Sequence, residues 1–302
     1  MDLRQLRALT AVAEHQSFSA AARALHTVQS NISTHIARLE RELDSTLIDR
    51  RTGRLTPEGE AVLSRANRIN SELEAIEADV AGLRHDVHGS VRFGIIGTTA
   101  RWLVPKLLDA LNTAHPGIRP IIVDATTTSL IPQLRSGTLD AALVNLPVDD
   151  PAITTEQLFS EERIVVTPND HPLAKYDEIS LGDLSEFPLI LSPVGTQLRD
   201  TLDAEAQRIG KTLTPAAEVD GMRLMASLAF QGHGAAILPA SAAPNGVFGD
   251  WKRVRVLGIS WRDVGLGIAA STAPSATDRA FHTVLREVIT SEAPNHDGLS
   301  LL

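Results

Sequence analysis

Residues 17–43 place the strongest constraint on how this chain can fold. Their sequence, SFSAAARALHTVQSNISTHIARLEREL, predicts a short alanine-rich helix and a second helix, joined by a tight polar turn. On the second helix, apolar residues recur at spacings of four, three and four, and therefore share one face: Ile32, Ile36, Leu39 and Leu43. The other face is neutral and polar. A pair of this kind suits a helix that lies in the major groove of DNA, although an ordinary helical bundle would show the same periodicity.

The composition is that of an ordinary globular protein with more than one domain. The chain has 302 residues, enough for two or three domains, and 22% of them are charged. It contains no cysteine, which excludes disulfides, thiolate metal sites and thiol redox switches. No signal peptide or membrane span is expected, because arginines interrupt the first apolar residues and Gly and Pro interrupt the longest uncharged run. A cytoplasmic location is therefore expected.

The net charge of −9 is unevenly distributed along the chain. Residues 1–57 contain eight arginines and six acidic residues, a local balance of +2, so the remainder carries −11. Attraction to phosphate depends on local charge and not on the total. A balance of +2 is weak, and high affinity for DNA would need two such units acting together.

The motifs of the N-terminal region resemble those of the LysR-type transcriptional regulators. The matching residues run in register through about sixty positions: Ala21, Ala22, Leu25, Gln29, Ser33, Ile36, Leu39, Glu40, Leu43, Arg50, Leu55, Thr56, Pro57 and Gly59. Asp44 departs from the pattern because the family usually has a C-cap glycine there, and Ile48 stands where the family favours Phe. The resemblance implies a winged helix-turn-helix DNA-binding domain over residues 1–57.

In this family the start of the second helix of the motif reads base edges. The residues carried over are Gln29, Ser30, Asn31, Ser33, Thr34 and His35. Gln and Asn can bond bidentately to adenine, whereas Ser and Thr accept either base type. Arg38, about a turn later, is a candidate for phosphate or guanine. Ser30 could instead cap the helix.

A small wing is predicted after this helix. Arg50, Arg51 and Arg54 flank Thr52-Gly53, a turn between short extended segments. Three arginines at such a turn suit contacts to phosphates or the minor groove. The alternative is a solvated loop.

A long helix is predicted to follow over residues 58–88. Thr56-Pro57-Glu58 has the N-cap, the first-turn proline and the acidic residue typical of a helix start. A heptad stripe then runs through Val62, Ala66, Ile69, Leu73, Ile76, Val80 and Leu83. A helix of about thirty residues spans roughly 45 Å, too long to bury this stripe in one small domain. Dimerisation is therefore favoured over packing on its own chain, and the family uses its linker helix in this way.

Beyond Gly89 the pattern changes to alternating strands and helices. Strands are predicted at 91–96, 121–123, 141–144, 164–166, 189–191, 235–238 and 266–270, and helices at 103–111, 130–135, 198–209, 222–230 and 275–290. This alternation predicts parallel, doubly wound sheets. The resemblance implies two α/β subdomains similar to periplasmic solute-binding proteins: subdomain I (about 89–160 plus 266–302) and subdomain II (about 161–265). Crossing strands are expected near 159–164 and 259–266, and the tail from 292 to 302 is expected to be loosely ordered.

Hydroxyl-rich loops follow three of the predicted strands. They contain Thr98 and Thr99, then Thr126, Thr127 and Thr128, and finally Gly195 and Thr196. Ligands bind at the carboxyl ends of such strands, and hydroxyls beside helix N-termini suit a carboxylate or another anion. Each loop is also an adequate helix N-cap. Their convergence on one cleft favours a small-molecule effector site, which the family also has there.

The sequence therefore predicts an α/β multidomain transcriptional regulator that acts as a homodimer or homotetramer on double-stranded DNA. Its expected partners are operator DNA, a small-molecule effector for which an anionic group is suited, a second copy of itself and, if it activates transcription, RNA polymerase. A solute-binding protein and an enzyme on the same α/β scaffold are the alternatives. No nucleotide-binding, nucleophile or metal motif supports an enzyme, and no cofactor is expected.

Overall fold

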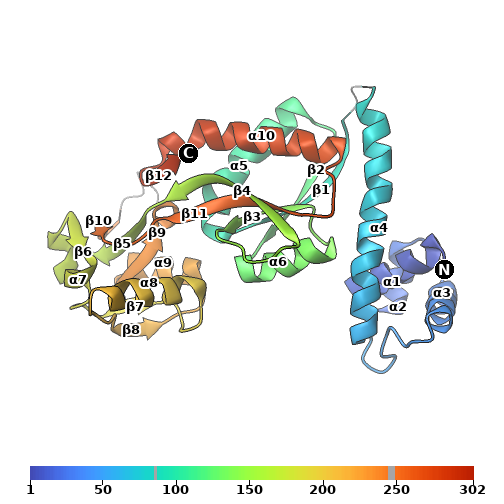
Figure 1. Cartoon of the computed structure of the whole chain (residues 1–302), viewed down its shortest axis with the longest axis horizontal. Helices are drawn as coiled ribbons and strands as arrows, with labels where there is room; N and C mark the ends of the chain where they lie inside the picture. The colour runs from blue at the N-terminus through green and yellow to red at the C-terminus, as the bar shows by residue number, and fades with distance from the viewer. Residues whose placement is uncertain (85–86, 244–248) are drawn as a thin grey trace.

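The computed structural model describes residues 1–84, 87–243 and 249–302 (Figure 1). Positions 85 and 86 of the predicted linker helix therefore lie outside the described residues. Figure 1 shows a small helical unit, one long helix beside it, and an elongated α/β region on the other side of that helix.

The N-terminal unit consists of three helices and a short wing. Helices α1 (Leu3–His15), α2 (Phe18–Ala24) and α3 (Gln29–Glu42) pack around a shared core that includes Leu9, Ala21, Ile32, Ile36 and Leu39. Asp2 and Ser17 cap α1 and α2 with their side chains, as helix N-termini require. The fourth member of the predicted stripe differs, because Leu43 is the C-cap of α3 and is 39% exposed.

The two departures from the family pattern are both accommodated. Asp44 adopts the left-handed conformation that the family's glycine would take, with a φ of 48°. Ile48 is only 1% exposed and pairs with Leu55 across the wing. Neither substitution therefore changes the path of the chain.

Helix α4 (Pro57–Gly82) has 26 residues and is shorter than predicted. It is capped by Thr56, whose side chain accepts a hydrogen bond from the amide of Gly59. A Cβ at Gly59 would overlap the carbonyl of Leu47, so glycine allows α4 to start directly against the wing. The orientation of α4 is thereby tied to the DNA-binding unit.

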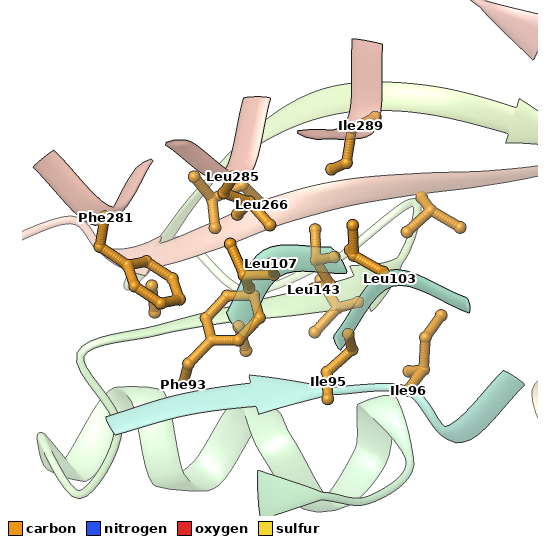
Figure 2. Packing of buried hydrophobic residues seen from close by; sticks show 14 of the residues in the cluster. Phe93, Ile95, Ile96, Leu103, Leu107, Leu143, Leu266, Phe281, Leu285 and Ile289 are labelled. Carbon is orange, nitrogen blue, oxygen red and sulfur yellow. The ribbon is translucent and has the colours of Figure 1, made fainter. Parts of the chain in front are cut away.

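The first sheet has the strand order β12-β4-β11-β3-β1-β2. Its strands are β1 (Gly89–Ile95), β2 (Ile118–Asp124), β3 (Ala141–Asn145), β4 (Ile153–Glu161), β11 (Arg262–Ala269) and β12 (Leu299–Leu301). Helices α5 (Gly97–Ala114) and α10 (Ala276–Glu292) cover one face, and α6 (Thr127–Ser136) covers the other (Figure 1). Figure 2 shows Phe93 and Leu143 of the sheet facing Leu107 and Phe281 of the helices, which forms the core of this subdomain.

The second sheet has the order β6-β10-β5-β9-β7-β8. Its strands are β5 (Arg163–Pro168), β6 (Glu178–Ser180), β7 (Leu189–Leu191), β8 (Pro215–Glu218), β9 (Ala235–Pro239) and β10 (Trp251–Leu257). Its helices are α7 (Leu181–Leu184), α8 (Gln197–Arg208) and α9 (Met222–Phe230). Short 3-10 turns complete the chain: η1 (Pro172–Lys175), η2 (Ala240–Ala242) and η3 (Ala293–Asn295).

The predicted parallel strands are present, but the first sheet is mixed. Strands β1, β2 and β3 are parallel, whereas β11 runs antiparallel to β3 and β4, and β12 runs antiparallel to β4. The chain leaves the first sheet at the end of β4 and re-enters it at the same end through β11, so these two strands run in opposite directions.

The prediction of a loosely ordered tail was wrong. The chain after α10 forms η3 and then β12, which pairs with β4, and Gly298 O accepts a 2.7 Å hydrogen bond from Glu162 N. The tail pairs with the otherwise open edge of β4. The sequence pattern alone does not reveal this pairing. Within the described ranges, no helix is both long and apolar enough to cross a membrane.

Candidate DNA-binding and effector sites

The polar face of α3 is open to solvent. Gln29, Ser30, Asn31, Thr34 and Arg38 are exposed, whereas Ser33 and His35 are half-buried. On the opposite side Ile32, Ile36 and Leu39 are each at most 1% exposed. Packing therefore fixes which face of α3 points away from the protein.

Local hydrogen bonds hold several of these side chains in place. Ser19 Oγ donates to Gln29 Oε1 at 2.7 Å, and Asn31 Nδ2 donates to Thr27 Oγ1 at 2.9 Å. Val28 occupies the N-cap position and contributes no side-chain bond, so Ser30 does not cap the helix. Ser30 remains free to be a contact residue.

The wing is an ordered turn that presents three exposed arginines. Gly53 has a φ of 71°, which favours glycine at this turn. Asp49 Oδ1 accepts the amide of Arg51 at 2.8 Å, and this hydrogen bond lowers the pKa of Asp49. Arg50, Arg51 and Arg54 are all exposed on the turn.

Glu40 connects the wing to α3. Its Oε1 accepts the amide of Leu47 at 2.9 Å, and its Oε2 lies 3.3 Å from Arg50 Nη2. One carboxylate thus fixes the wing relative to the helix whose polar face would enter a groove.

Most of the predicted heptad stripe on α4 remains uncovered. Ala66 is buried against the N-terminal unit, and Val62 and Leu73 are half-buried. The exposed fraction is 38% for Ile69, 61% for Ile76, 51% for Val80 and 84% for Leu83. The structure therefore leaves an apolar row on the side of α4 that its own chain does not cover.

In the cleft between the subdomains, Thr98 and Thr99 contact an arginine that the sequence pattern did not single out. Arg262 Nη2 donates to Thr98 Oγ1 at 2.8 Å and lies 3.5 Å from Thr99 Oγ1. Arg262 also forms an ion pair with Glu161, which is fully buried. Glu161 ends β4 and Arg262 begins β11, so the pair lies where both crossing strands leave the first sheet.

The other predicted loop residues divide between capping and lining roles. Thr126 and Thr196 act as N-caps of α6 and α8, and Thr127 Oγ1 accepts the amide of Asn145 at 2.9 Å. Thr128 and Gly195 come from different subdomains and line one open depression of about 640 Å³, together with Gln197, Asp200, Thr201, Ala204, Glu205 and Arg208. The structure therefore brings two of the seven predicted residues together around one cavity.

A second cavity of about 710 Å³ lies between α5 and α9. Thr98 lines it with Arg101, Asp124, Arg223 and Phe230. Arg223 of α9 forms an ion pair with Asp124 at the end of β2, which links the two subdomains on this side. Sequence reasoning missed Arg262, Glu161 and Arg223, since no motif distinguishes them from other charged residues.

Comparison with known families identifies the two halves of the chain. Residues 3–60 match the family of bacterial regulatory helix-turn-helix proteins of the lysR type, and residues 84–290 match the LysR substrate binding domain. The chain belongs to the LysR family of transcriptional regulators. It is a DNA-binding regulator with an effector-binding domain, and its relatives are regulators and not enzymes.

Individual relatives cover nearly the whole of this LysR-type regulator. A protein of Mycobacterium leprae named "Probable hydrogen peroxide-inducible genes activator" is 34% identical, over 95% of this chain and 94% of its own length. The full-length OxyR of Pseudomonas aeruginosa has a similar structure, with a TM-score of 0.78 and 27% identity over 96% of this chain and 94% of its own. CbnR in complex with its target DNA shares the fold, with a TM-score of 0.68 and 24% identity over 97% of this chain and 100% of its own.

Proposed function

We propose that this regulator reads its operator with the exposed face of α3, positions two such helices through α4, and changes their spacing when a small effector occupies the cleft. The observation that carries this proposal is the separation of faces on α3. Its apolar face is fully buried, while Gln29, Asn31 and Arg38 point away from the protein. Only such a face can reach base edges in a major groove.

The wing supplies contacts of another kind. Arg50, Arg51 and Arg54 are exposed on a turn that Glu40 and Asp49 hold in place. Arginines in this arrangement suit phosphate contacts, which set affinity and register without reading sequence. The local charge of +2 means that one such unit binds weakly.

Pairing of two units through α4 is supported by the uncovered row of Ile69, Ile76, Val80 and Leu83. Residues 1–57 and α4 would then move as one piece, because Gly59 packs α4 against the wing. We propose a homodimer or homotetramer on this basis, acting in the cytoplasm where operator DNA is found. RNA polymerase is a further partner if the regulator activates transcription.

For the effector we favour the depression lined by Thr128 and Gly195. It lies between α6 and α8, whose N-termini belong to different subdomains. A ligand that bridges them can bias one subdomain arrangement by its differential affinity for the two. The exposed Arg208 at its margin and the two helix N-termini suit an anionic group. Asp200 and Glu205 line the same depression, and their negative charges disfavour ligands that carry several anionic groups.

Peroxide is a signal that the names of the relatives suggest. This chain has no cysteine, so a thiol or disulfide cannot carry such a signal here. We propose instead that a reversibly bound small molecule sets the state of this regulator.

The proposed reading of DNA can be tested with two matched variants after the operator has been selected from random duplexes with the full-length chain. Asn31→Ala should relax sequence preference at one position and cost about 1–3 kcal/mol on the selected site. Arg54→Ala should weaken binding to all sequences alike and reduce the salt slope by about one.

Arg119→Ala, an exposed arginine on β2, serves as the control and should change neither quantity. Unchanged salt dependence in Arg54→Ala would remove the wing from the interface. A thermal-shift screen of small carboxylates and aromatics with the wild-type chain and Thr128→Val would test the effector site, since a bound ligand stabilises the native state.

A further inference from the structure

A third cavity lies outside the cleft, between the linker helix and the first sheet. It has a volume of about 350 Å³, within the range of sites that hold small ligands. One wall is α4, and the others come from β1, the segment between α6 and β3, the end of β11 and the start of α10. Figure 1 shows α4 in this position, between the N-terminal unit and the α/β region.

Close packing at two points holds the cavity open between them. A Cβ on Gly82 would come within 2.8 Å of the Ala276 Cβ, and a Cβ on Gly137 within 2.8 Å of the Arg68 Cγ. The backbone at these glycines therefore comes too close to its neighbours for a side chain to fit. Between the two points the helix and the domain are joined by polar contacts.

These polar contacts include an ion pair, a hydrogen bond from a backbone amide and a hydrogen bond between two side chains. Glu74 of α4 accepts two hydrogen bonds from Arg92, at 3.2 and 3.3 Å. Asp79 accepts the amide of Ala276 at 2.8 Å, and Arg68 Nη1 donates to Ser271 Oγ at 3.1 Å. Exposed polar contacts of this kind each contribute little stability, so a bound ligand can shift the position of α4 relative to the first subdomain.

The lining of the cavity is strongly acidic. It contains five carboxylates and one guanidinium, those of Glu72, Glu74, Glu77, Asp140, Asp278 and Arg68. Asp140 lines the cavity with 15% of its side chain exposed, and Arg92 Nη1 lies 3.9 Å from its Oδ2. Burial, together with the charges of Asp278 and Glu74, raises the pKa of Asp140 to about 6 although Arg92 opposes this rise, so the carboxylate is mostly ionised at pH 7.

An unpartnered side chain at the same cavity points independently to a ligand. His282 is 6% exposed, and its Nε2 has no hydrogen-bond partner among the described residues. Burial lowers the pKa of His282 and so favours the neutral ring, which can accept an N–H. A buried polar atom without a partner costs free energy that a bound donor would recover.

We propose that this cavity binds a small organic cation with N–H donors, a primary ammonium or a guanidinium on a short aliphatic body. The charged end lies against Asp140 and the acidic wall, and an N–H is donated to His282 Nε2. The aliphatic part packs on Ala75, Ala78, Leu134 and Ile268, which supply apolar surface in the same cavity. Binding fastens α4 to subdomain I and so couples a second chemical signal to the position of the DNA-binding unit.

The test uses the full-length chain at pH 7 in calorimetric titrations with n-butylamine and butylguanidine. The matched probes are n-butanol, which is neutral, and tetramethylammonium, which is a cation without N–H groups. We expect saturable binding of one amine or guanidine per chain and at least ~tenfold weaker binding of both matched probes. Hydrogen exchange in α4 should slow when the cation binds and stay unchanged with butanol.

Four variants test whether the binding takes place in this cavity. Asp140→Asn, which keeps the shape and can still accept the amide of Arg92, should weaken binding at least ~tenfold. Thr128→Val in the cleft should leave it unchanged. His282→Gln, which retains an acceptor, should bind better than His282→Leu, and a thermal melt confirms that each variant is folded.

Four results would overturn the proposal. They are the absence of saturable binding by either cation, equal binding of butanol, equal binding by folded Asp140→Asn, and loss of binding in Thr128→Val. A failure of this site would leave the cleft proposal untouched, since the two sites share no lining residue.

Discussion

At the scale of single residues, the buried ion pair of Arg262 and Glu161 should have a large effect on the free energy of unfolding when one partner is removed. Glu161 is fully buried and Arg262 is 9% exposed, while the amide of Ser241 also donates to Glu161 at 2.5 Å. A buried charge is tolerated because its partner and these hydrogen bonds replace water. The same arginine positions the hydroxyl of Thr98 in the cleft.

Removing one partner of this pair should be far more damaging than removing a surface pair. Arg262→Met leaves Glu161 buried without compensation and should lower the free energy of unfolding by about 3–5 kcal/mol. Arg286→Met breaks an exposed pair with Glu156 and should cost less than about 1 kcal/mol. Urea unfolding followed by tryptophan fluorescence measures both values.

The double variant Arg262→Met/Glu161→Met provides the control. Replacing both charges with apolar groups should recover most of the lost stability, because no unpaired charge remains. If Arg262→Met and Arg286→Met cost the same, the buried pair would have no special role in stability.

Asp140 should make stability depend on pH over a defined window. Burial raises its pKa from 3.8 to about 6, so the folded chain holds this proton more tightly than the unfolded chain. The stabilising effect of protonation is complete below pH 3.8 and is lost as the pH rises through about 6. At pH 7 the ionised carboxylate then costs about 3 kcal/mol, because each pKa unit of the shift corresponds to about 1.4 kcal/mol.

Asp140→Asn removes this dependence. The free energy of unfolding of the variant should match that of the wild type near pH 4 and exceed it by up to about 3 kcal/mol at pH 7, in unfolding curves measured at several pH values. Parallel stability profiles for the two proteins would show that Asp140 ionises normally in the folded chain.

At the scale of elements, α4 has three different sides. One side starts against the wing through Gly59, a second faces subdomain I through Glu74 and Asp79, and a third carries the uncovered apolar row. A heptad row that is exposed in the single chain is the feature a second copy of the same helix would cover. Under the proposed function, this helix would connect DNA binding, effector sensing and self-association.

A charge in this row should weaken self-association without unfolding the chain. Ile76 is 61% exposed, so Ile76→Glu should leave the thermal melt of the monomer nearly unchanged. It should raise the dissociation constant of the dimer at least ~tenfold, measured by sedimentation equilibrium. Ile76→Leu keeps the row apolar and should associate like the wild type. An unaltered dissociation constant in Ile76→Glu would place the dimer contact elsewhere.

At the scale of the whole molecule, two α/β subdomains are joined by two crossing segments, and α4 connects them to the DNA-binding unit. The chain passes to the second sheet between Glu161 and Arg163 and returns between Leu257 and Arg262. Asp124 and Arg223 add a more exposed link across the cleft. Two thin crossings and a weak surface pair suit a hinge whose closure a ligand can bias.

Peroxide should not switch this molecule through thiol chemistry. The chain has no cysteine, so brief exposure to hydrogen peroxide should leave its affinity for the selected operator unchanged, measured by fluorescence anisotropy. Mass spectrometry of Met1, Met222 and Met225 controls for slower thioether oxidation. A rapid change in affinity with all three methionines unmodified would contradict the prediction.

Local sequence patterns determined most of the helices and strands of this protein. The apolar spacing at Ile32, Ile36 and Leu39 fixed the face of α3, and Thr56-Pro57 fixed the start of α4, because periodicity and capping act over a few residues. The alternation after Gly89 likewise predicted most strands and helices, since each element must bury one side.

Tertiary structure decided what depends on contacts between distant segments. The antiparallel return of β11, the pairing of the tail with β4 and the meeting of Glu161 with Arg262 join residues that lie far apart in the sequence. No short-range signal marks such partners, because each residue alone resembles many other exposed or capping residues. The polar face of α3 was therefore predictable from spacing. The residues that surround the cleft and the cavity beside α4 were not predictable in this way, because only the tertiary structure brings them together.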